Sequence, residues 1–244
     1  MRYILKFSYA GANYSGYQRQ KNKKTIQEEI EKVFLQIFKT EVPIVASGRT
    51  DAGVSAIEQV AHFDVTELID TKRICGYANS LLPDDIRINA IEKVEENFHA
   101  RYSAKRKTYE YLFYVGQSRI PVYDNIASHI NYNVDINLMQ EACQFFMGEH
   151  DFSSFCASNT DVKDKKRTIY DMNISCISDN LYRLSITGSG FLYNMVRIIM
   201  GTLSEVGIGK IVPSDIKSII LSQDRAKSGK TAEAKGLYLK KVLY

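Results

Sequence analysis

The sequence predicts an α+β protein whose two halves share one order of elements: strand, helix, strand, strand, helix, strand. Three observations lead to this prediction. Several segments alternate apolar and polar residues, as strands with one buried face do. Other segments repeat apolar residues at helical spacing. The order in which the two kinds occur up to residue 104 then recurs, although the sequence itself contains no repeat.

The first half supplies every element of one such unit. Residues 2–9 alternate in polarity, so their odd-numbered aromatic and aliphatic side chains share one face of a strand. The segment Thr25-Ile26-Gln27-Glu28 has the form of a capping box, and apolar residues follow it at helical spacing. A second helix is expected over residues 71–82, ended by Pro83. The other strands are expected over residues 42–47, 57–65 and 86–94.

The second half begins with a predicted strand over residues 108–115, followed by a helix over residues 136–147 that ends at Gly148. The further elements are a hairpin of residues 167–178 and 181–187, a helix around residues 192–203 and a strand over residues 236–244. Such an order makes an antiparallel layer backed by helices, the ferredoxin-like arrangement. We therefore expect an N-terminal ferredoxin-like domain over residues 1–104, which carries the Asp51 loop, and a C-terminal one over residues 105–244.

Composition narrows the class of protein. No apolar run is long enough for a membrane span, and the first ten residues lack the apolar stretch of a signal peptide, so a cytoplasmic protein is expected. The four cysteines are scattered and predict free thiols, and the four histidines have no ligand spacing, so no metal is expected. The net charge of +4 arises after residue 104, where 18 basic residues outnumber 14 acidic ones.

Three basic clusters, at residues 19–24, 105–107 and 163–167, suit a partner with a phosphate backbone. The alternative is a solvated surface, which such clusters form more often than binding sites. The individual candidates for phosphate contact are Arg19, Arg101, Lys105, Arg106, Lys107 and Arg167.

The segment Ser47–Gly53 is the first candidate for chemistry. It connects two apolar strands, and its glycines permit tight turns that would expose Asp51. Arg49 in the same loop would favour the ionised form of that carboxyl. The alternative is an Asx-type turn in which Asp51 only caps its own loop.

Arg197 and Tyr109 are the other candidates. Arg197 interrupts an apolar helical run, so it lies either on the solvent face or buried against an acid, because an unpaired buried charge is very costly. Tyr109 follows the basic residues 105–107 in a strand, where sheet aromatics can stack bases. The alternative for Tyr109 is that a half-buried strand simply favours tyrosine.

Motifs along the whole chain resemble, in order, those of the tRNA pseudouridine synthase A family. They are Phe7–Gly11, Tyr14–Gln20, Gly48–Val54, Gln59–Phe63, Asn79–Ile86, Phe98–Arg101, Tyr109–Tyr111, Gly148–Phe155, Gly190–Arg197 and Gly236–Leu239. The resemblance implies two ferredoxin-like halves joined into one mostly antiparallel sheet with helices on one face. It also implies a homodimer that binds tRNA and needs neither cofactor nor metal.

The resemblance implies an isomerase that converts uridine to pseudouridine in the anticodon arm, at tRNA positions 38, 39 and 40. It assigns the nucleophile to Asp51 and gives Arg49 a part in holding the extruded nucleotide. It sets Tyr109 against the target base and pairs Arg197 with Asp51. The basic residues named above would then hold the tRNA.

Two positions depart from the family pattern. Ser55 stands where the family usually has His, and Glu233 stands near a position that tends to be Pro. Because Ser55 is close to the Asp51 loop, a paralogue that modifies another RNA uridine is one alternative. A second is a non-catalytic RNA-binding module or tRNA chaperone. A third, a metal-dependent nuclease, would need clustered acids or histidines, which the sequence does not provide at ligand spacing.

Overall fold

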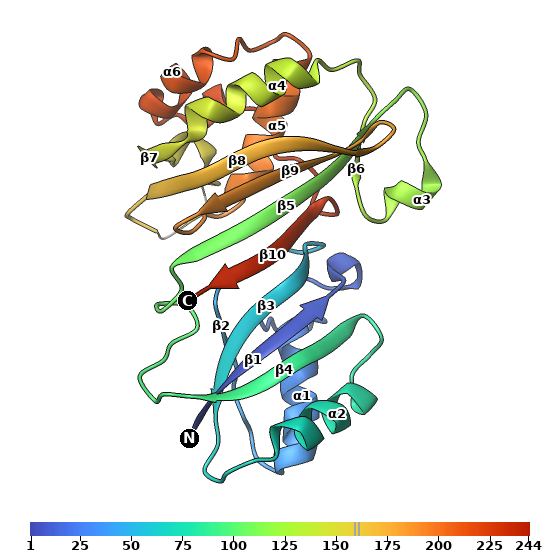
Figure 1. The fold of residues 1–244 in the computed structure, drawn as a ribbon, viewed down its shortest axis with the longest axis vertical. Coiled ribbons are helices and arrows are strands. Elements are labelled where there is room, and N and C mark those ends of the chain that lie inside the picture. The colour runs from blue at the N-terminus through green and yellow to red at the C-terminus, as the bar shows by residue number, and fades with distance from the viewer. Residues whose placement is uncertain (159, 161) are drawn as a thin grey trace. The chain divides into compact units, whose positions relative to one another are not determined.

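The computed structural model describes residues 1–158, 160 and 162–244 (Figure 1). The chain divides into two compact units. The first unit comprises Met1–Lys105 and Tyr238–Tyr244, and the second unit comprises Arg106–Leu237. The last strand of the chain, which we expected in the C-terminal half, thus lies almost wholly in the first unit.

The first unit has the predicted strand–helix–strand–strand–helix–strand order. Its elements are β1 (Arg2–Tyr9), α1 (Ile26–Phe38), β2 (Val45–Ala46), β3 (Ser55–Asp64), α2 (Thr71–Leu81) and β4 (Ile86–Val94). Strand β1 lies between β3 and β4 and is antiparallel to both. The two-residue strand β2, much shorter than predicted, pairs antiparallel with the far end of β3. At its start, β3 instead pairs in parallel with Tyr238 and Leu239 of β10 (Leu237–Leu243).

Both helices of the first unit cover one face of its sheet. The Phe34 ring of α1 meets that of Phe63 at 5.0 Å, and Phe63 stands opposite Tyr3 in the β1–β3 register. From α2, the Asn79 amide nitrogen donates to the carbonyl oxygen of Ile88 at 2.8 Å. Because Ile88 stands opposite Phe7, and Phe7 shares the face of Tyr3, the helices pack on the same side.

Helix α1 begins where it was predicted, but the predicted capping box is wrong. The Thr25 side chain makes no capping hydrogen bond, and its hydroxyl is buried. The first two helical amides are satisfied from elsewhere: that of Ile26 donates to the Gly16 carbonyl at 3.3 Å, and that of Gln27 to the Tyr17 carbonyl at 3.0 Å. The preceding loop therefore supplies the acceptors that a capping side chain would have given.

The second unit contains the predicted strands and helices together with short elements that the sequence did not suggest. The predicted ones are β5 (Arg106–Val115), α4 (Ile136–Cys143), β8 (Lys166–Ser178), β9 (Leu181–Gly188) and α5 (Met195–Gly207). The additional ones are α3 (Pro121–Asp124), β6 (Ser128–Ile130), β7 (Gly148–Asp151) and α6 (Asp215–Ser222). Strands β8 and β9 form the predicted antiparallel hairpin, and β9 pairs antiparallel with β5.

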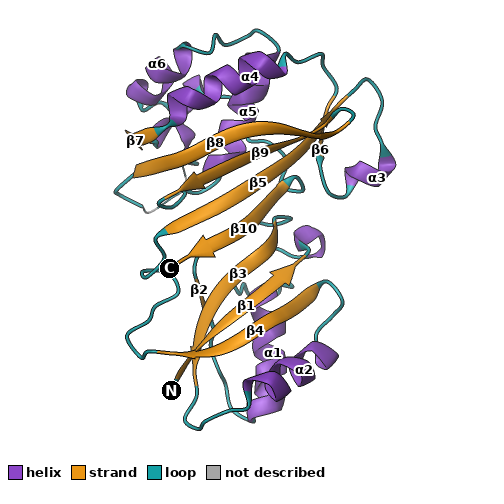
Figure 2. Ribbon diagram, viewed as in Figure 1, coloured by secondary structure: helices purple, strands orange, loops and turns teal. Residues whose placement is uncertain are grey.

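Pairing among the strands of the described residues is mostly antiparallel, and helices and strands are both abundant (Figure 2). The predicted α+β class with a mostly antiparallel sheet is therefore confirmed. None of the helices in the described ranges is both long and apolar enough to cross a membrane.

Candidate active site

The segment Gly48–Gly53 connects β2 to β3 as a tight turn of the first unit. The Val54 amide donates to the Asp51 carbonyl at 3.1 Å, and Gly53 adopts a left-handed conformation with φ of 79°. Asp51 is half-buried, whereas Arg49 is exposed. The predicted tight turn is thus present and uses the left-handed conformation of Gly53, but Asp51 is half-buried where the glycine spacing predicted an exposed side chain.

A second loop lies directly against the Asp51 turn. The Tyr17 amide donates to the Thr50 carbonyl at 3.1 Å, and the Gly53 amide donates to the Tyr14 carbonyl at 3.4 Å. At Gly16, whose φ is 92°, a Cβ atom would lie 2.9 Å from the Thr50 carbonyl oxygen. Only glycine therefore allows this approach, and the 11–17 loop is part of the site's framework.

A buried polar network supports the Asp51 turn from the strands below it. The Tyr9 hydroxyl lies 2.8 Å from the Thr50 hydroxyl, and the Gln59 amide nitrogen donates to the Gly48 carbonyl at 3.1 Å and to the Tyr9 hydroxyl at 3.4 Å. The Ser47 hydroxyl donates to the Gln59 amide oxygen at 2.8 Å. Burial raises the pKa of Tyr9 to about 12, so its hydroxyl keeps its proton at neutral pH.

The sequence analysis gave no individual role to Tyr9, Ser47 or Gln59. One signal could have found Gln59, because it alternates with the apolar Ala61 and Phe63 along β3 and is, like them, buried. A buried amide of this kind needs hydrogen-bond partners. Those partners are the turn residues around Asp51.

Ser55, one of the departures from the family pattern, also holds the framework together. Its hydroxyl accepts the amide of Gly11 at 3.0 Å. At residue 11 a Cβ atom would lie 2.1 Å from the Val54 carbonyl oxygen, so the chain approaches too closely for any side chain. Ser55 thus joins the start of β3 to the loop that packs on the Asp51 turn.

Tyr109 and Arg197 both belong to the second unit. Tyr109, on β5, is 9% exposed, and its ring meets that of Phe191 edge-on at 5.1 Å. Arg197, on α5, is half-buried rather than on the solvent face. Its Nε atom donates to the Ala232 carbonyl at 2.7 Å, and its Nη1 atom donates to the Asn194 side-chain oxygen at 3.0 Å. The guanidinium is therefore fixed by neutral acceptors on two sides.

The loop that holds Arg197 is itself anchored to β5. The Tyr111 hydroxyl donates to the Glu233 carbonyl at 2.8 Å and lies 2.6 Å from the Ser128 hydroxyl. Since a phenol has one proton, Tyr111 accepts from Ser128. Glu233, the second departure from the family pattern, contributes its backbone to this contact.

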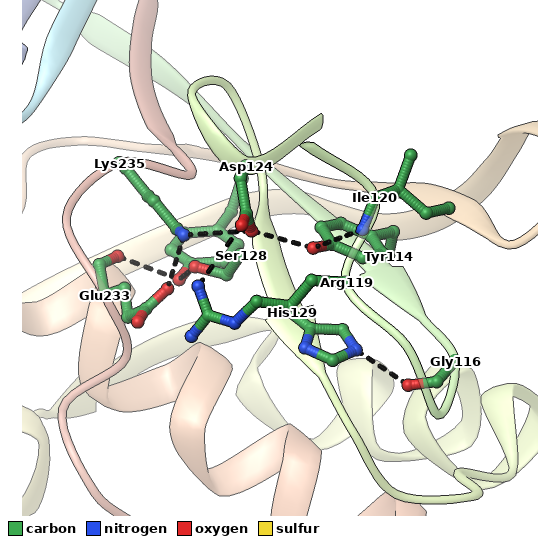
Figure 3. Close-up of polar contacts among 10 residues, drawn as sticks. Tyr114, Gly116, Arg119, Ile120, Asp124, Ser128, His129, Glu233 and Lys235 are labelled. Carbon is green, nitrogen blue, oxygen red and sulfur yellow. Dashed lines mark hydrogen bonds and ion pairs between the residues drawn. The ribbon is translucent and has the colours of Figure 1, made fainter. Parts of the chain in front are cut away.

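Charged side chains reinforce the same loop (Figure 3). The Lys235 ammonium lies 3.4 Å from the Asp124 carboxylate and 3.3 Å from that of Glu233. Asp124 also accepts the Tyr114 hydroxyl at 2.7 Å and pairs with Arg119 at 3.2 Å. These contacts connect the short α3 segment to the loop whose backbone holds Arg197.

The predicted basic residues are divided between the units. Arg19, Arg101 and Lys105 are exposed in the first unit, where Arg19 lies 3.4 Å from the Glu31 carboxylate. The second unit carries Arg106, Lys107 and Arg167.

Arg106 and Arg167 both contact other groups of the second unit. The Arg106 guanidinium lies 4.6 Å from the centre of the Tyr170 ring, a cation–π contact. Arg167 donates to the Asp164 carbonyl at 3.1 Å. In the described part of the chain, no three histidines, cysteines or acids are grouped so that they could hold a metal ion.

Comparison with known proteins agrees with the motifs of the site. The tRNA pseudouridine synthase family model matches residues 7–103 and 142–244. The tRNA pseudouridine synthase A of Bacillus licheniformis is 46% identical over 246 residues, which cover 100% of this chain and 99% of that protein. The enzyme of the same name from Bacillus subtilis is 45% identical with the same coverage.

A relative from a third organism gives the same result. The tRNA pseudouridine synthase A of Caldicellulosiruptor saccharolyticus is 45% identical over 241 residues, covering 99% of this chain and 98% of that protein. Residues 104–141, which include Tyr109, lie outside the family match but within alignments that cover the whole chain. Since the match extends through both units, this chain belongs to the tRNA pseudouridine synthase family.

Proposed function

We propose that this chain isomerises uridine to pseudouridine in the anticodon arm of tRNA, at positions 38, 39 and 40, with Asp51 as the nucleophile. The observation that carries the assignment of Asp51 is the fixed turn around it. Backbone bonds from the 11–17 loop and the Tyr9–Gln59–Ser47 network hold the turn, while Asp51 stays half-buried. A carboxylate held in this way is preorganised for attack.

The reaction needs no group beyond the chain's own side chains. The bond between sugar C1′ and base N1 breaks, the base rotates, and a bond forms between C1′ and C5. The proton on C5 is lost and N1 gains one, so that product and substrate have the same atoms and the same oxidation state. A covalent adduct with the Asp51 carboxylate would divide this change into easier steps.

The nucleophile must be ionised, and we assign that task to an ion pair between Arg197 and Asp51. The guanidinium uses its Nε and one Nη1 hydrogen on Ala232 and Asn194. An arginine has five N–H donors in a planar fork, so one guanidinium can bond several partners at once. An opposite charge nearby favours the ionised carboxyl.

The target uridine must leave its stack to reach Asp51, which costs a few kcal/mol. We assign the compensating contacts to Tyr109, whose ring is held edge-on by Phe191, and to Arg49, which is exposed in the Asp51 turn. Phosphate contacts from the basic residues of both units would position the tRNA without reading its sequence. We further propose that the enzyme is a homodimer.

The competing function is RNA binding without catalysis. Asp51→Asn removes the nucleophilic charge but keeps the size of the side chain, so we expect pseudouridine formation to fall below detection while the Kd for tRNA stays within a few-fold. Chemical labelling of pseudouridine in a tRNA transcript measures the first quantity, and filter binding the second. Asp84→Asn, at an exposed acid of the same unit, is the matched control and should remain fully active.

Full activity of Asp51→Asn would exclude Asp51 as the nucleophile. A wild-type protein that binds the transcript and forms no pseudouridine would instead support the binding module.

A further inference from the structure

A tightly held turn follows β4 in the first unit. The Ser103 amide donates to the His99 carbonyl at 2.8 Å, and the His99 amide donates to the Ser103 hydroxyl at 3.0 Å. From outside the turn, Arg2 donates to the Phe98 carbonyl at 2.8 Å, and the Tyr244 hydroxyl donates to the Ala100 carbonyl at 2.8 Å. We call residues 98–103 the 98–103 turn. Its backbone is fixed by side chains from both ends of the chain.

The 98–103 turn displays Tyr102 on the surface. At 76% exposed, Tyr102 is the most exposed tyrosine among the described residues. Its ring lies against the His99 imidazole, with 4.4 Å between the ring centres and 36° between the planes. The Arg101 guanidinium lies 5.7 Å from the centre of the Tyr102 ring. A large aromatic ring is thus supported from one side and left mostly open to solvent.

The support beneath Tyr102 is also fixed. His99 Nδ1 accepts the amides of Arg101 at 3.1 Å and of Tyr102 at 3.3 Å, which sets the orientation of the imidazole. The His99 ring packs in turn on the buried His62 ring at 4.7 Å, and His62 Nδ1 accepts the Ala100 amide at 3.2 Å. Because this support already restricts the Tyr102 side chain, less conformational entropy is lost when a partner stacks on its ring.

We propose that Tyr102, supported by His99 and flanked by Arg101, is a stacking platform for an unpaired nucleobase of the RNA substrate, separate from the uridine that reacts at Asp51. The proposal rests on the proposed function only in taking the RNA to be the tRNA substrate. Every base has a π-face, so an exposed aromatic ring beside a cation suits an unpaired nucleotide of any sequence. Arg101 and the nearby exposed Lys105 supply charge for the adjoining phosphates.

A protein partner suits this surface less well. One ring bordered by cations offers little of the apolar area that a stable protein interface buries. Stacking on a base requires an aromatic side chain, and an aliphatic side chain of similar size cannot replace it. The platform should therefore contribute to affinity for the tRNA and not to the chemical step.

Substitutions at Tyr102 test that requirement. For base–aromatic stacking we expect Tyr102→Ala and Tyr102→Leu to raise KM for a tRNA transcript by about 5- to 100-fold with kcat unchanged, while Tyr102→Phe stays near wild type. Tyr77→Ala is the matched control. Tyr77 is a 54%-exposed tyrosine of the same unit with no ring or cation against it among the described residues. Equal KM values for the Leu, Ala and wild-type proteins would overturn the proposal.

Fluorescence gives a direct readout, because the chain has no tryptophan. In Tyr102→Trp the single indole should be quenched when the full-length enzyme binds an unmodified tRNA transcript, whereas Tyr77→Trp should be unaffected. Pseudouridine is measured in the same samples, and RNA binding is measured independently by filter retention. Quenching without pseudouridine would keep the platform and reject the proposed function. Pseudouridine formation with unquenched Tyr102→Trp at saturating RNA would reject the platform alone.

Discussion

At the scale of single residues, the Tyr9 hydroxyl on β1 contacts residues that position the Asp51 turn. It contacts the hydroxyl of Thr50, the immediate neighbour of Asp51, and the amide of Gln59, which also holds Gly48. A nucleophile must stay close to its productive geometry, and small displacements cost large factors in rate. Tyr9 is therefore expected to act on catalysis without touching the substrate.

Tyr9→Phe should lower kcat by about 10- to 100-fold and leave KM for tRNA nearly unchanged, because the turn loses a positioning contact and no binding group. The buried Thr50 hydroxyl also loses a partner, which should reduce the free energy of unfolding by about 1–2 kcal/mol. Single-turnover kinetics and urea denaturation measure the two effects. Tyr3→Phe is the control, because the Tyr3 hydroxyl on the same strand accepts the Ile69 amide and does not contact the turn. Equal loss of kcat in both variants would contradict the positioning role.

At the scale of elements, two loops of the first unit depend on each other. The 11–17 loop supplies acceptors to the first amides of α1 and also bonds to the backbone on either side of Asp51. Its closest approach is at Gly16. A strong local signal, the apparent capping box at Thr25, was misleading because the tertiary contact had already satisfied those amides.

Gly16→Ala tests this dependence. The new Cβ would lie 2.9 Å from the Thr50 carbonyl oxygen, and φ is positive, so we expect a loss of about 1–3 kcal/mol in the free energy of unfolding and a lower kcat. Gly76→Ala on α2 meets nothing within 4 Å and should be neutral or stabilising by up to about 1 kcal/mol. Thermal denaturation of both variants gives the comparison. A Gly16→Ala protein as stable and active as wild type would contradict the dependence of the Asp51 turn on the 11–17 loop.

In the second unit the corresponding element is the loop before β10. It holds Arg197 through Ala232 and is anchored by Tyr111 and by the charged side chains around Lys235. The position of Arg197 thus depends on contacts more than 30 residues away along the chain. A short segment that the sequence did not predict, α3, supplies Asp124 to that anchor.

At the scale of the whole molecule, buried tyrosines are expected to make the folded state less stable at alkaline pH. Burial raises the pKa of Tyr9 to about 12, and burial also raises the pKa values of Tyr17 and Tyr111. In the unfolded chain a tyrosine titrates near pH 10. The folded state therefore holds more protons between those values, and its stability is complete below about pH 10 and falls as pH rises toward 12.

We expect the free energy of unfolding to fall above pH 10 with a slope of up to about 1.4 kcal/mol per pH unit for each such tyrosine. Urea denaturation at several pH values measures the slope. Tyr9→Phe should make it shallower, because one group no longer titrates. An unchanged slope in that variant would mean that Tyr9 ionises in the folded protein as easily as in the unfolded one.

We expect tRNA binding to depend on basic residues of both units. Replacing Lys105, Arg106 and Lys107 together by Gln should reduce the slope of log Kd against log salt by about 2–3, since each phosphate contact contributes just under one. The control replaces Lys39, Lys72 and Lys93, which changes the charge equally and should leave the slope nearly intact. Titrations of a tRNA transcript at several salt concentrations decide between them. Equal slopes for the two triple variants would exclude residues 105–107 from the tRNA path.

The sequence by itself determined the α+β class, the order of elements in the first unit, the β8–β9 hairpin and the family. Each of these depends on patterns within a few neighbouring residues or on motifs in a fixed order. The turn at Asp51 was also predicted from such a pattern, because Gly48 and Gly53 stand on either side of it. The two compact units do not follow a single boundary, because Tyr238–Tyr244 belong with Met1–Lys105.

Only the tertiary structure decided which distant groups hold that turn. Tyr9, Ser47 and Gln59 meet because β1 and β3 pair, and Ala232 reaches Arg197 because the loop before β10 packs on α5. The last strand joins the first unit for the same kind of reason, since its pairing with β3 spans most of the chain. A long-range hydrogen bond leaves no periodic trace in the sequence, because its partners are chosen only when the folded chain brings them together.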